Sequence, residues 1–234
     1  MGMAGMMVVA LGLGLAGCRK VEKGPVQTEE TGEAAAEPKP AETKGGYETI
    51  DEAIARGELE EVRRQITEDP KKIHEGKNPG MSPLLQSVLR SKDEIALVLL
   101  EAGADPNKRD QSDRTALHLA VERGNAALVP RLIAYKADPN LLDKTGWTPL
   151  HWAAAKDKLE VAKALLDGGA DVKVLSAAGG TALHEGAASG GEAMIQLLLE
   201  RGVDPTVVSK TGVTALDVAK EMKNEAAIKV LGAL

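Results

Sequence analysis

The sequence has 234 residues, a formal net charge of −6 and only four aromatic residues, none of them phenylalanine. It therefore lacks the basic excess that neutralises phosphates and the rings on which bases stack, so we expect no nucleic-acid partner. Its single cysteine, Cys18, excludes an intramolecular disulfide and a cysteine-rich metal site.

An apolar leader precedes this cysteine. Residues 6–16 are apolar or glycine throughout, and no charged side chain occurs before Arg19. The run is too short to span a bilayer, which takes about 20 residues, but it suits the apolar region of a secretory signal peptide. The leader ends in the tetrad Leu15-Ala16-Gly17-Cys18. This tetrad resembles the lipobox of bacterial lipoproteins.

The lipoprotein resemblance implies a cleaved signal peptide over residues 1–17 and a lipidated Cys18 as the first mature residue. The thiol would carry a diacylglyceryl group, and several acyl chains together anchor a protein stably. Arg19 stands where an aspartate would favour inner-membrane retention. We therefore expect the periplasmic face of the outer membrane. The alternative is an apolar leader that ends in cysteine by chance.

Residues 18–46 change character and predict a flexible tether. They are rich in Glu, Lys, Pro, Ala, Thr and Gly, with almost nothing apolar after Val26. Such a stretch cannot bury enough surface to offset the entropy lost on ordering. As a random coil its ends would lie roughly 30 Å apart, which would hold the following residues away from a membrane.

A constant period runs through the rest of the chain. A small or apolar residue followed by aspartate recurs, and a threonine or serine that opens the next unit recurs in step. The aspartates are Asp105, Asp138, Asp171 and Asp204, and the openers are Ser82, Thr115, Thr148, Thr181 and Thr214. A fixed period of this size predicts stacked supersecondary units, each unable to bury its apolar face alone.

Each period predicts a pair of helices. Thr148 is a good N-cap and Pro149 a good first helical residue. Apolar residues at helical spacing predict a second helix over residues 158–167, and Gly169 then suits a left-handed helix end. One unit departs from this pattern: it has Lys136 in place of that glycine, and Pro130 about one turn into its second helix. We expect this unit to be the least regular.

The motif Thr148-Pro149-Leu150-His151, followed by paired leucines and Gly169-Ala170-Asp171, resembles the ankyrin repeat. The resemblance covers residues 47–234, with units opening near residues 49, 82, 115, 148, 181 and 214. The first unit is degenerate and one residue out of register, and both end units read as polar caps. The resemblance implies an all-α solenoid of about six stacked helix-turn-helix units, with finger-like loops beside a concave groove that binds other proteins.

Outside the repeat pattern, the sequence offers no serine or cysteine nucleophile with histidine and acidic partners. His118, His151 and His184 lie one repeat apart, on the order of 10 Å, which is too far for one metal ion. In ankyrin repeats this histidine bonds between layers. Asp110 and Asp143 fall at turns, where aspartate bonds to its own backbone. We expect no metal, no cofactor and no catalysis.

Two tryptophans in one unit are the strongest candidates for partner contact. Trp147 is expected at a finger tip, and Trp152 on the groove side of a first helix. They either anchor a partner or pack between helices and fingers. Further groove and finger candidates are Lys156, Arg123, Glu122, Arg114, Arg109 and Glu185. The fingers change from basic at Lys108–Arg114 to apolar at Val174, Leu175, Val207 and Val208.

Together these features predict a monomeric, membrane-tethered ankyrin scaffold that binds a protein partner in the bacterial envelope. The first alternative is a periplasmic inhibitor or immunity protein that blocks an enzyme or toxin. An enzyme would require clustered acidic residues with raised pKa values, and the sequence shows none. A structural assembly protein would associate with itself through its convex face.

Overall fold

A computed structural model describes residues 47–74, 76–78 and 80–234. The predicted leader, Cys18 and the tether lie outside these residues. The first helices of the units are α1 (Ile50–Arg56), α3 (Pro83–Leu89), α5 (Ala116–Arg123), α7 (Pro149–Ala155), α9 (Ala182–Ser189) and α11 (Ala215–Met222). The second helices are α2 (Leu59–Glu68), α4 (Asp93–Glu101), α6 (Val129–Ala134), α8 (Leu159–Asp167), α10 (Glu192–Glu200) and α12 (Glu225–Leu231), and a 3-10 turn, η1 (Pro70–Ile73), follows α2.

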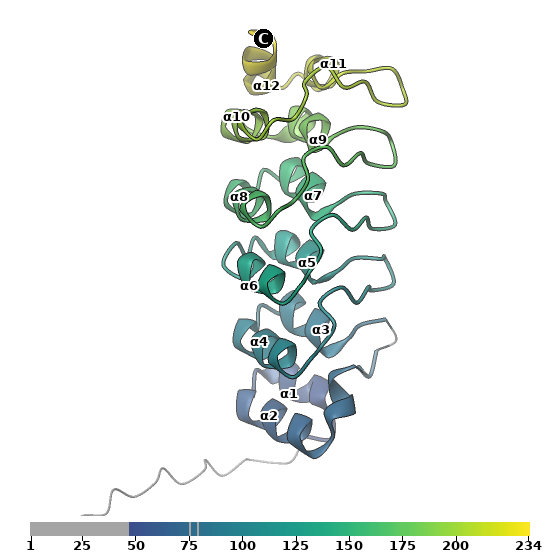
Figure 1. Cartoon of the computed structure of the whole chain (residues 1–234), viewed down its shortest axis with the longest axis vertical. Coiled ribbons are helices and arrows are strands. Elements are labelled where there is room, and N and C mark those ends of the chain that lie inside the picture. Colours follow the sequence, from purple (N-terminus) through teal and green to yellow (C-terminus); the bar gives the residue numbers. More distant parts are fainter. Residues whose placement is uncertain (1–46, 75, 79) are drawn as a thin grey trace, which may run out of the picture. The chain divides into compact units, whose positions relative to one another are not determined.

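The helix pairs stack in chain order, so that first helices form one column and second helices another (Figure 1). The loops between units project as fingers on the side of the first helices (Figure 1). Among the described residues there is no strand. The predicted all-α solenoid of about six stacked helix pairs with finger-like loops is confirmed.

Capping side chains start each first helix at the predicted period. Their N-caps are Thr49, Ser82, Thr115, Thr148, Thr181 and Thr214, which are evenly spaced along the chain. In the units that open at 115, 148 and 181, the threonine and a histidine three residues on satisfy each other's backbone N–H groups. These reciprocal bonds supply acceptors for backbone N–H groups that a helix start leaves unpaired.

The first unit was expected to lie one residue out of the repeat register, and only its second helix, α2, does so. Thr49 lies one full period before Ser82, so α1 is in register and the expectation is wrong there. The left-handed residue that ends α1 is Gly57, whereas the equivalent turn after α7 uses Asp157, one position later in its unit. This shorter turn starts α2 one residue early, which is the displacement visible in the sequence.

One continuous core runs between the two columns. Leu99, Leu132, Leu165 and Leu198 take the same position in successive second helices and are completely buried. Each belongs to the same cluster of buried aliphatic side chains. Stability is therefore distributed over neighbouring layers, as expected for a repeat protein.

The unit with Pro130 is irregular, as predicted. Its second helix, α6, has 6 residues, compared with 9 in α8. Residues 126–128 form a turn, so the helix begins at Val129 and Pro130 is near its start, not one turn inside. This late start is the reason that the missing proline N–H is tolerated. Lys136 adopts a left-handed φ of 72°, where Gly169 has 93°.

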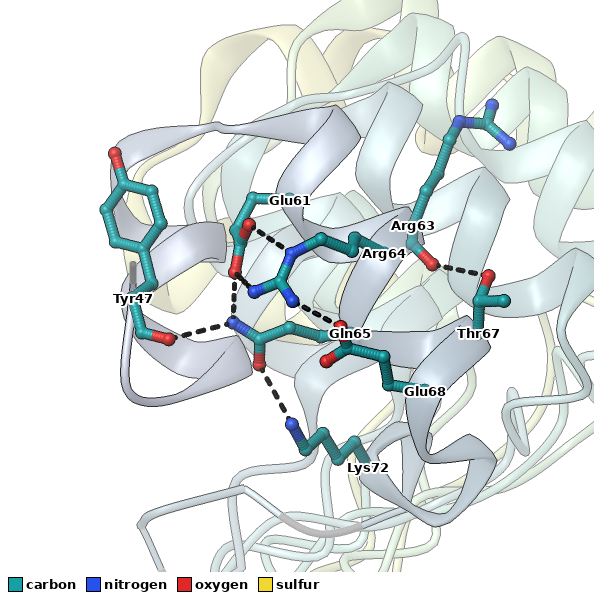
Figure 2. Close-up of polar contacts among 8 residues, drawn as sticks. All are labelled: Tyr47, Glu61, Arg63, Arg64, Gln65, Thr67, Glu68 and Lys72. Atoms are coloured by element: carbon teal, nitrogen blue, oxygen red, sulfur yellow. Dashed lines mark hydrogen bonds and ion pairs between the residues drawn. The ribbon is translucent and has the colours of Figure 1, made fainter. Parts of the chain in front are cut away.

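Both ends of the stack present polar side chains. In the first unit, the buried carboxylate of Glu61 accepts hydrogen bonds from Arg64 (2.9 and 2.7 Å) and from Gln65 (2.7 Å) (Figure 2). The Gln65 amide also donates to the carbonyl oxygen of Tyr47, and Lys72 donates to Gln65 (Figure 2). The hydrogen bond from Arg64, the largest influence, helps hold the Glu61 pKa below its ordinary value. In the last unit Lys220, Glu221, Lys223 and Glu225 are exposed.

Candidate functional site

The two tryptophans of the chain meet on the face where the fingers adjoin the first helices, which we call the inner face. Their ring centroids lie 5.4 Å apart with an interplanar angle of 72°, an edge-to-face pair. The Lys156 ammonium lies 5.0 Å from the centroid of the Trp152 ring. Trp147 and Trp152 are each half-buried, and Lys156 is exposed. We call these three residues the Trp cluster.

A turn at the tip of the finger fixes the Trp cluster. The Asp143 carboxylate accepts hydrogen bonds from the backbone N–H groups of Thr145 and Trp147 at 2.9 and 3.0 Å. Its other oxygen accepts the indole N–H of Trp152 at 2.9 Å. Trp147 thus lies on the returning arm of the finger, and its expected place at the tip is wrong. The sequence placed Asp143 at a turn, but no sequence pattern showed that it also holds Trp152.

The electrostatics of Asp143 agree with this supporting role. Burial, the largest influence, would raise its pKa, but several hydrogen bonds act in the opposite direction. The hydrogen bonds from Thr145, Trp147 and Trp152 prevail, and the pKa of Asp143 lies below its ordinary value. The carboxylate is therefore ionised at neutral pH and keeps the indole oriented.

The repeat histidines have a structural role. In each, Nδ1 accepts the N–H of the N-cap threonine, and Nε2 bonds to a carbonyl oxygen in the next unit. The carbonyl partners are Trp147 for His118 (3.1 Å), Gly180 for His151 (3.3 Å) and Val213 for His184 (3.3 Å). Burial lowers all three pKa values, that of His151 to about 4. The described residues contain no cluster of three or more potential metal ligands.

The basic finger is less available for binding than its sequence indicates. Arg114 pairs with Asp110 at 2.9 Å and with Glu122 at 2.8 Å. Arg109 donates to the carbonyl oxygen of Leu142 in the next finger at 2.8 Å. Arg109 therefore joins two neighbouring fingers, whereas Arg114 and Glu122 form an ion pair within their own unit. Arg123 remains exposed, with no hydrogen bond or ion pair to the rest of the described chain.

Glu185 occupies the position in α9 that Trp152 occupies in α7, one repeat earlier. Its side chain is half-buried and makes no hydrogen bond or ion pair with any described residue. Burial raises its pKa above the ordinary value. Glu185 therefore lies on the same side of the column of first helices as Trp152, one unit further along the stack.

The fingers carry an apolar stripe that the sequence revealed in part. Leu142, Leu175 and Val208 hold equivalent positions in three successive fingers and are 37%, 47% and 54% exposed. Leu142 was missed, although its spacing of one full period from Leu175 was a usable signal. The stripe gives the later fingers an apolar surface, as the expected change from basic to apolar fingers implies.

Comparison with known proteins identifies the fold family. A model of three ankyrin repeats matches residues 84–176, and a model of one ankyrin repeat matches residues 178–210. Together these matches span more than half of the chain. The chain belongs to the ankyrin-repeat family. Within the described residues, no helix is long and apolar enough to cross a membrane.

Relatives with established names share short stretches with this ankyrin-repeat chain. Inversin from Danio rerio is 39% identical over 82 residues, which are 35% of this chain and 8% of inversin. NF-kappa-B inhibitor alpha from Sus scrofa is 44% identical over 69 residues, 30% of this chain and 22% of the inhibitor. The chain thus spans under a quarter of the length of either relative.

A solved structure resembles most of the chain. It is a complex of a predatory endopeptidase from Bdellovibrio bacteriovorus with an immunity protein. One of its chains aligns with a TM-score of 0.71 and 26% identity, over 81% of this chain and 99% of that chain.

Proposed function

We propose that this ankyrin-repeat protein binds a protein partner in the bacterial envelope through its inner face. The observation that carries the proposal is the Trp cluster: the chain has two tryptophans, and both meet half-exposed on this face. Tryptophan is over-represented among the residues that dominate binding energy. A pair braced by Asp143 is already ordered, so little rotamer entropy is lost on binding. The proposed role is binding without catalysis.

The proposal includes a membrane tether. Its support is the sequence Leu15-Ala16-Gly17-Cys18, followed by a long polar stretch before the repeats. Lipid on Cys18 would hold the protein at the periplasmic face of the outer membrane and leave the inner face free. Replacing Cys18→Ser would then abolish labelling by a fatty-acid probe and leave an uncleaved precursor. A soluble, unlabelled wild-type protein would refute the tether.

A second candidate function is inhibition of an enzyme or toxin. Support comes from the similar chain in the complex of an endopeptidase with an immunity protein, and from the similarity to an inhibitor of NF-kappa-B. In this role the inner face would occlude a catalytic site. The two candidates differ in one measurement: only an inhibitor lowers the activity of the partner that it captures.

The test is capture of the partner from detergent-solubilised envelope, followed by titration of the purified partner. We expect Trp147→Ala with Trp152→Ala to weaken binding by at least about 2 kcal/mol, roughly thirtyfold. Because Trp152 also packs against the core, Trp152→Phe is a second variant that preserves packing and removes the bond to Asp143.

The matched control is Tyr135→Ala, which removes an exposed aromatic side chain at the end of a second helix. It should bind as wild type. Circular dichroism of the same samples measures folding. If the double variant is folded and its affinity is unchanged, the partner does not use the Trp cluster, and the proposed interface is wrong.

A further inference from the structure

The first helices α7 and α9 run side by side with a fixed register. The Ser189 hydroxyl donates to the carbonyl oxygen of Ala155 at 2.7 Å. The Gly191 N–H donates to the Asp157 carboxylate at 3.0 Å. Packed helix axes lie about 8–10 Å apart. These bonds align the carboxyl-terminal ends of the two helices.

The same register places Trp152 across from Glu185. Trp152 lies one helical turn before Ala155, and Glu185 lies one turn before Ser189. Residues three or four apart lie on one side of a helix. Because the Ser189 hydroxyl is bonded to the Ala155 carbonyl oxygen, Trp152 and Glu185 lie on the same side of the α7–α9 pair, at equivalent positions of neighbouring units.

Each of these two side chains is suited to a cation. Glu185 is half-buried, and no described residue supplies a positive charge or a hydrogen bond to its carboxylate. Removing a carboxylate from water without a partner is costly. The Trp152 ring already holds the exposed Lys156 ammonium 5.0 Å from its centroid, so one face of this indole accepts a cation.

We propose that Trp152 and Glu185 form a receptor for an arginine side chain of the protein partner. The inference rests on the proposed binding function and specifies the chemistry of the partner. A guanidinium group is planar, so it can accept a carboxylate in a forked pair while it lies against an aromatic ring. A lysine ammonium can satisfy only one of these contacts well. Lys156 would move into solvent when the arginine enters.

The test uses the two indole N–H signals, which report this site because both tryptophans belong to the Trp cluster. The folded protein is titrated with acetyl-Gly-Arg-Gly-amide, and with the same peptide carrying lysine or citrulline. We expect the arginine peptide to shift the Trp152 signal at lower concentration than the lysine peptide. Citrulline, which has the shape of arginine without its charge, should give no shift.

Three variants sharpen the result. Glu185→Gln should weaken the arginine peptide at least about tenfold, whereas Glu200→Gln, which removes an exposed charge from α10, should leave its binding unchanged. Lys156→Ala should strengthen binding about two- to fivefold, because a competing cation is gone.

Equal shifts with arginine and citrulline, no shift with any peptide, or wild-type binding by Glu185→Gln would each overturn the receptor. If one of these results occurs while the Trp cluster is still required for partner capture, the proposed function stands and only the arginine receptor fails. If the arginine peptide does not bind and the Trp cluster is also not required for partner capture, the inner face is not the interface.

Discussion

The imidazole of His151 donates its Nε2 hydrogen to the carbonyl oxygen of Gly180, 3.3 Å away in the next unit. Its Nδ1 accepts the Thr148 N–H, so the ring is neutral and both nitrogens are used. One side chain therefore caps its own helix and joins two layers. A protonated ring would place a hydrogen against the Thr148 N–H.

We predict that acid weakens the stack through His151 as the pH falls from 6.5 toward 4. Burial lowers the pKa of His151 from 6.5 to about 4. Stability from the neutral ring is thus present above pH 6.5 and is lost as pH falls toward 4, by about 1.4 kcal/mol per pH unit. Urea denaturation at several pH values measures this slope. His151→Gln should reduce the slope without abolishing it, because burial also lowers the pKa values of His118 and His184. His74→Gln, which changes an exposed histidine, should leave the slope as it is.

Leu165 should contribute far more to stability than Lys156 in the same unit. The Leu165 side chain is completely buried between layers, so Leu165→Ala should cost about 2–5 kcal/mol. Lys156 is exposed, so Lys156→Ala should cost under about 1 kcal/mol. Equal shifts of the urea midpoint in the two variants would contradict the observed layering.

Replacing Lys136→Gly should stabilise the protein. The left-handed backbone of Lys136 costs about 1–2 kcal/mol for a residue with a side chain, and glycine avoids this cost but loses about 0.5–1 kcal/mol of entropy. The net gain should raise the melting temperature by about 2–4 °C. As a control, Lys144→Gly at an exposed site in the next finger should not raise it.

Gly146 should tolerate no side chain. Its φ is 77°, and a Cβ there would lie 2.2 Å from the Cβ of Ala177 in the next finger and 2.8 Å from its backbone nitrogen. Gly146→Ala would separate the fingers and break the bond from the Ala177 N–H to the Gly146 carbonyl. We expect a lower melting temperature. Gly212→Ala, at a φ of 82° with no atom within 4 Å, tests the backbone effect alone and should be milder.

Glu185→Gln should stabilise the free protein at pH 7. Burial raises the Glu185 pKa, so the stability linked to its protonation is present below pH 4.5 and is lost as pH rises through the folded pKa. Glutamine has no charge to desolvate. The gain in urea midpoint should be largest at neutral pH and should shrink toward pH 4.5. A constant gain at all pH values would show that charge is not its cause.

The sequence predicts the fold well because the same capping, helix-start and helix-end residues recur in successive repeats. Thr148, Pro149 and Gly169 each have a local cause, namely a cap, a helix start and a left-handed end. The errors arose where two local signals compete. Pro130 lies at the start of a shortened helix instead of one turn inside it, and Gly57 shifted α2 while α1 stayed in register.

The candidate site was only partly predictable. The periodic position of Trp152 and Glu185 indicates the inner face, but not that Trp147 turns toward Trp152. Nor does spacing show that Arg109 donates to the carbonyl oxygen of Leu142 or that Arg114 pairs with Asp110. These contacts depend on side-chain rotamers across the turn, which a period in the sequence does not encode.

The placement of both tryptophans in a single layer also determines how unfolding will be seen. Among the described residues, the main contacts of each unit are with the adjacent units, so the polar end units can fray while the middle remains folded. Indole fluorescence would report melting of the fourth unit, whereas far-ultraviolet circular dichroism averages over all helices. If the dichroism transition begins at a lower temperature than the fluorescence transition, the difference between the two temperatures would measure the cooperativity between layers.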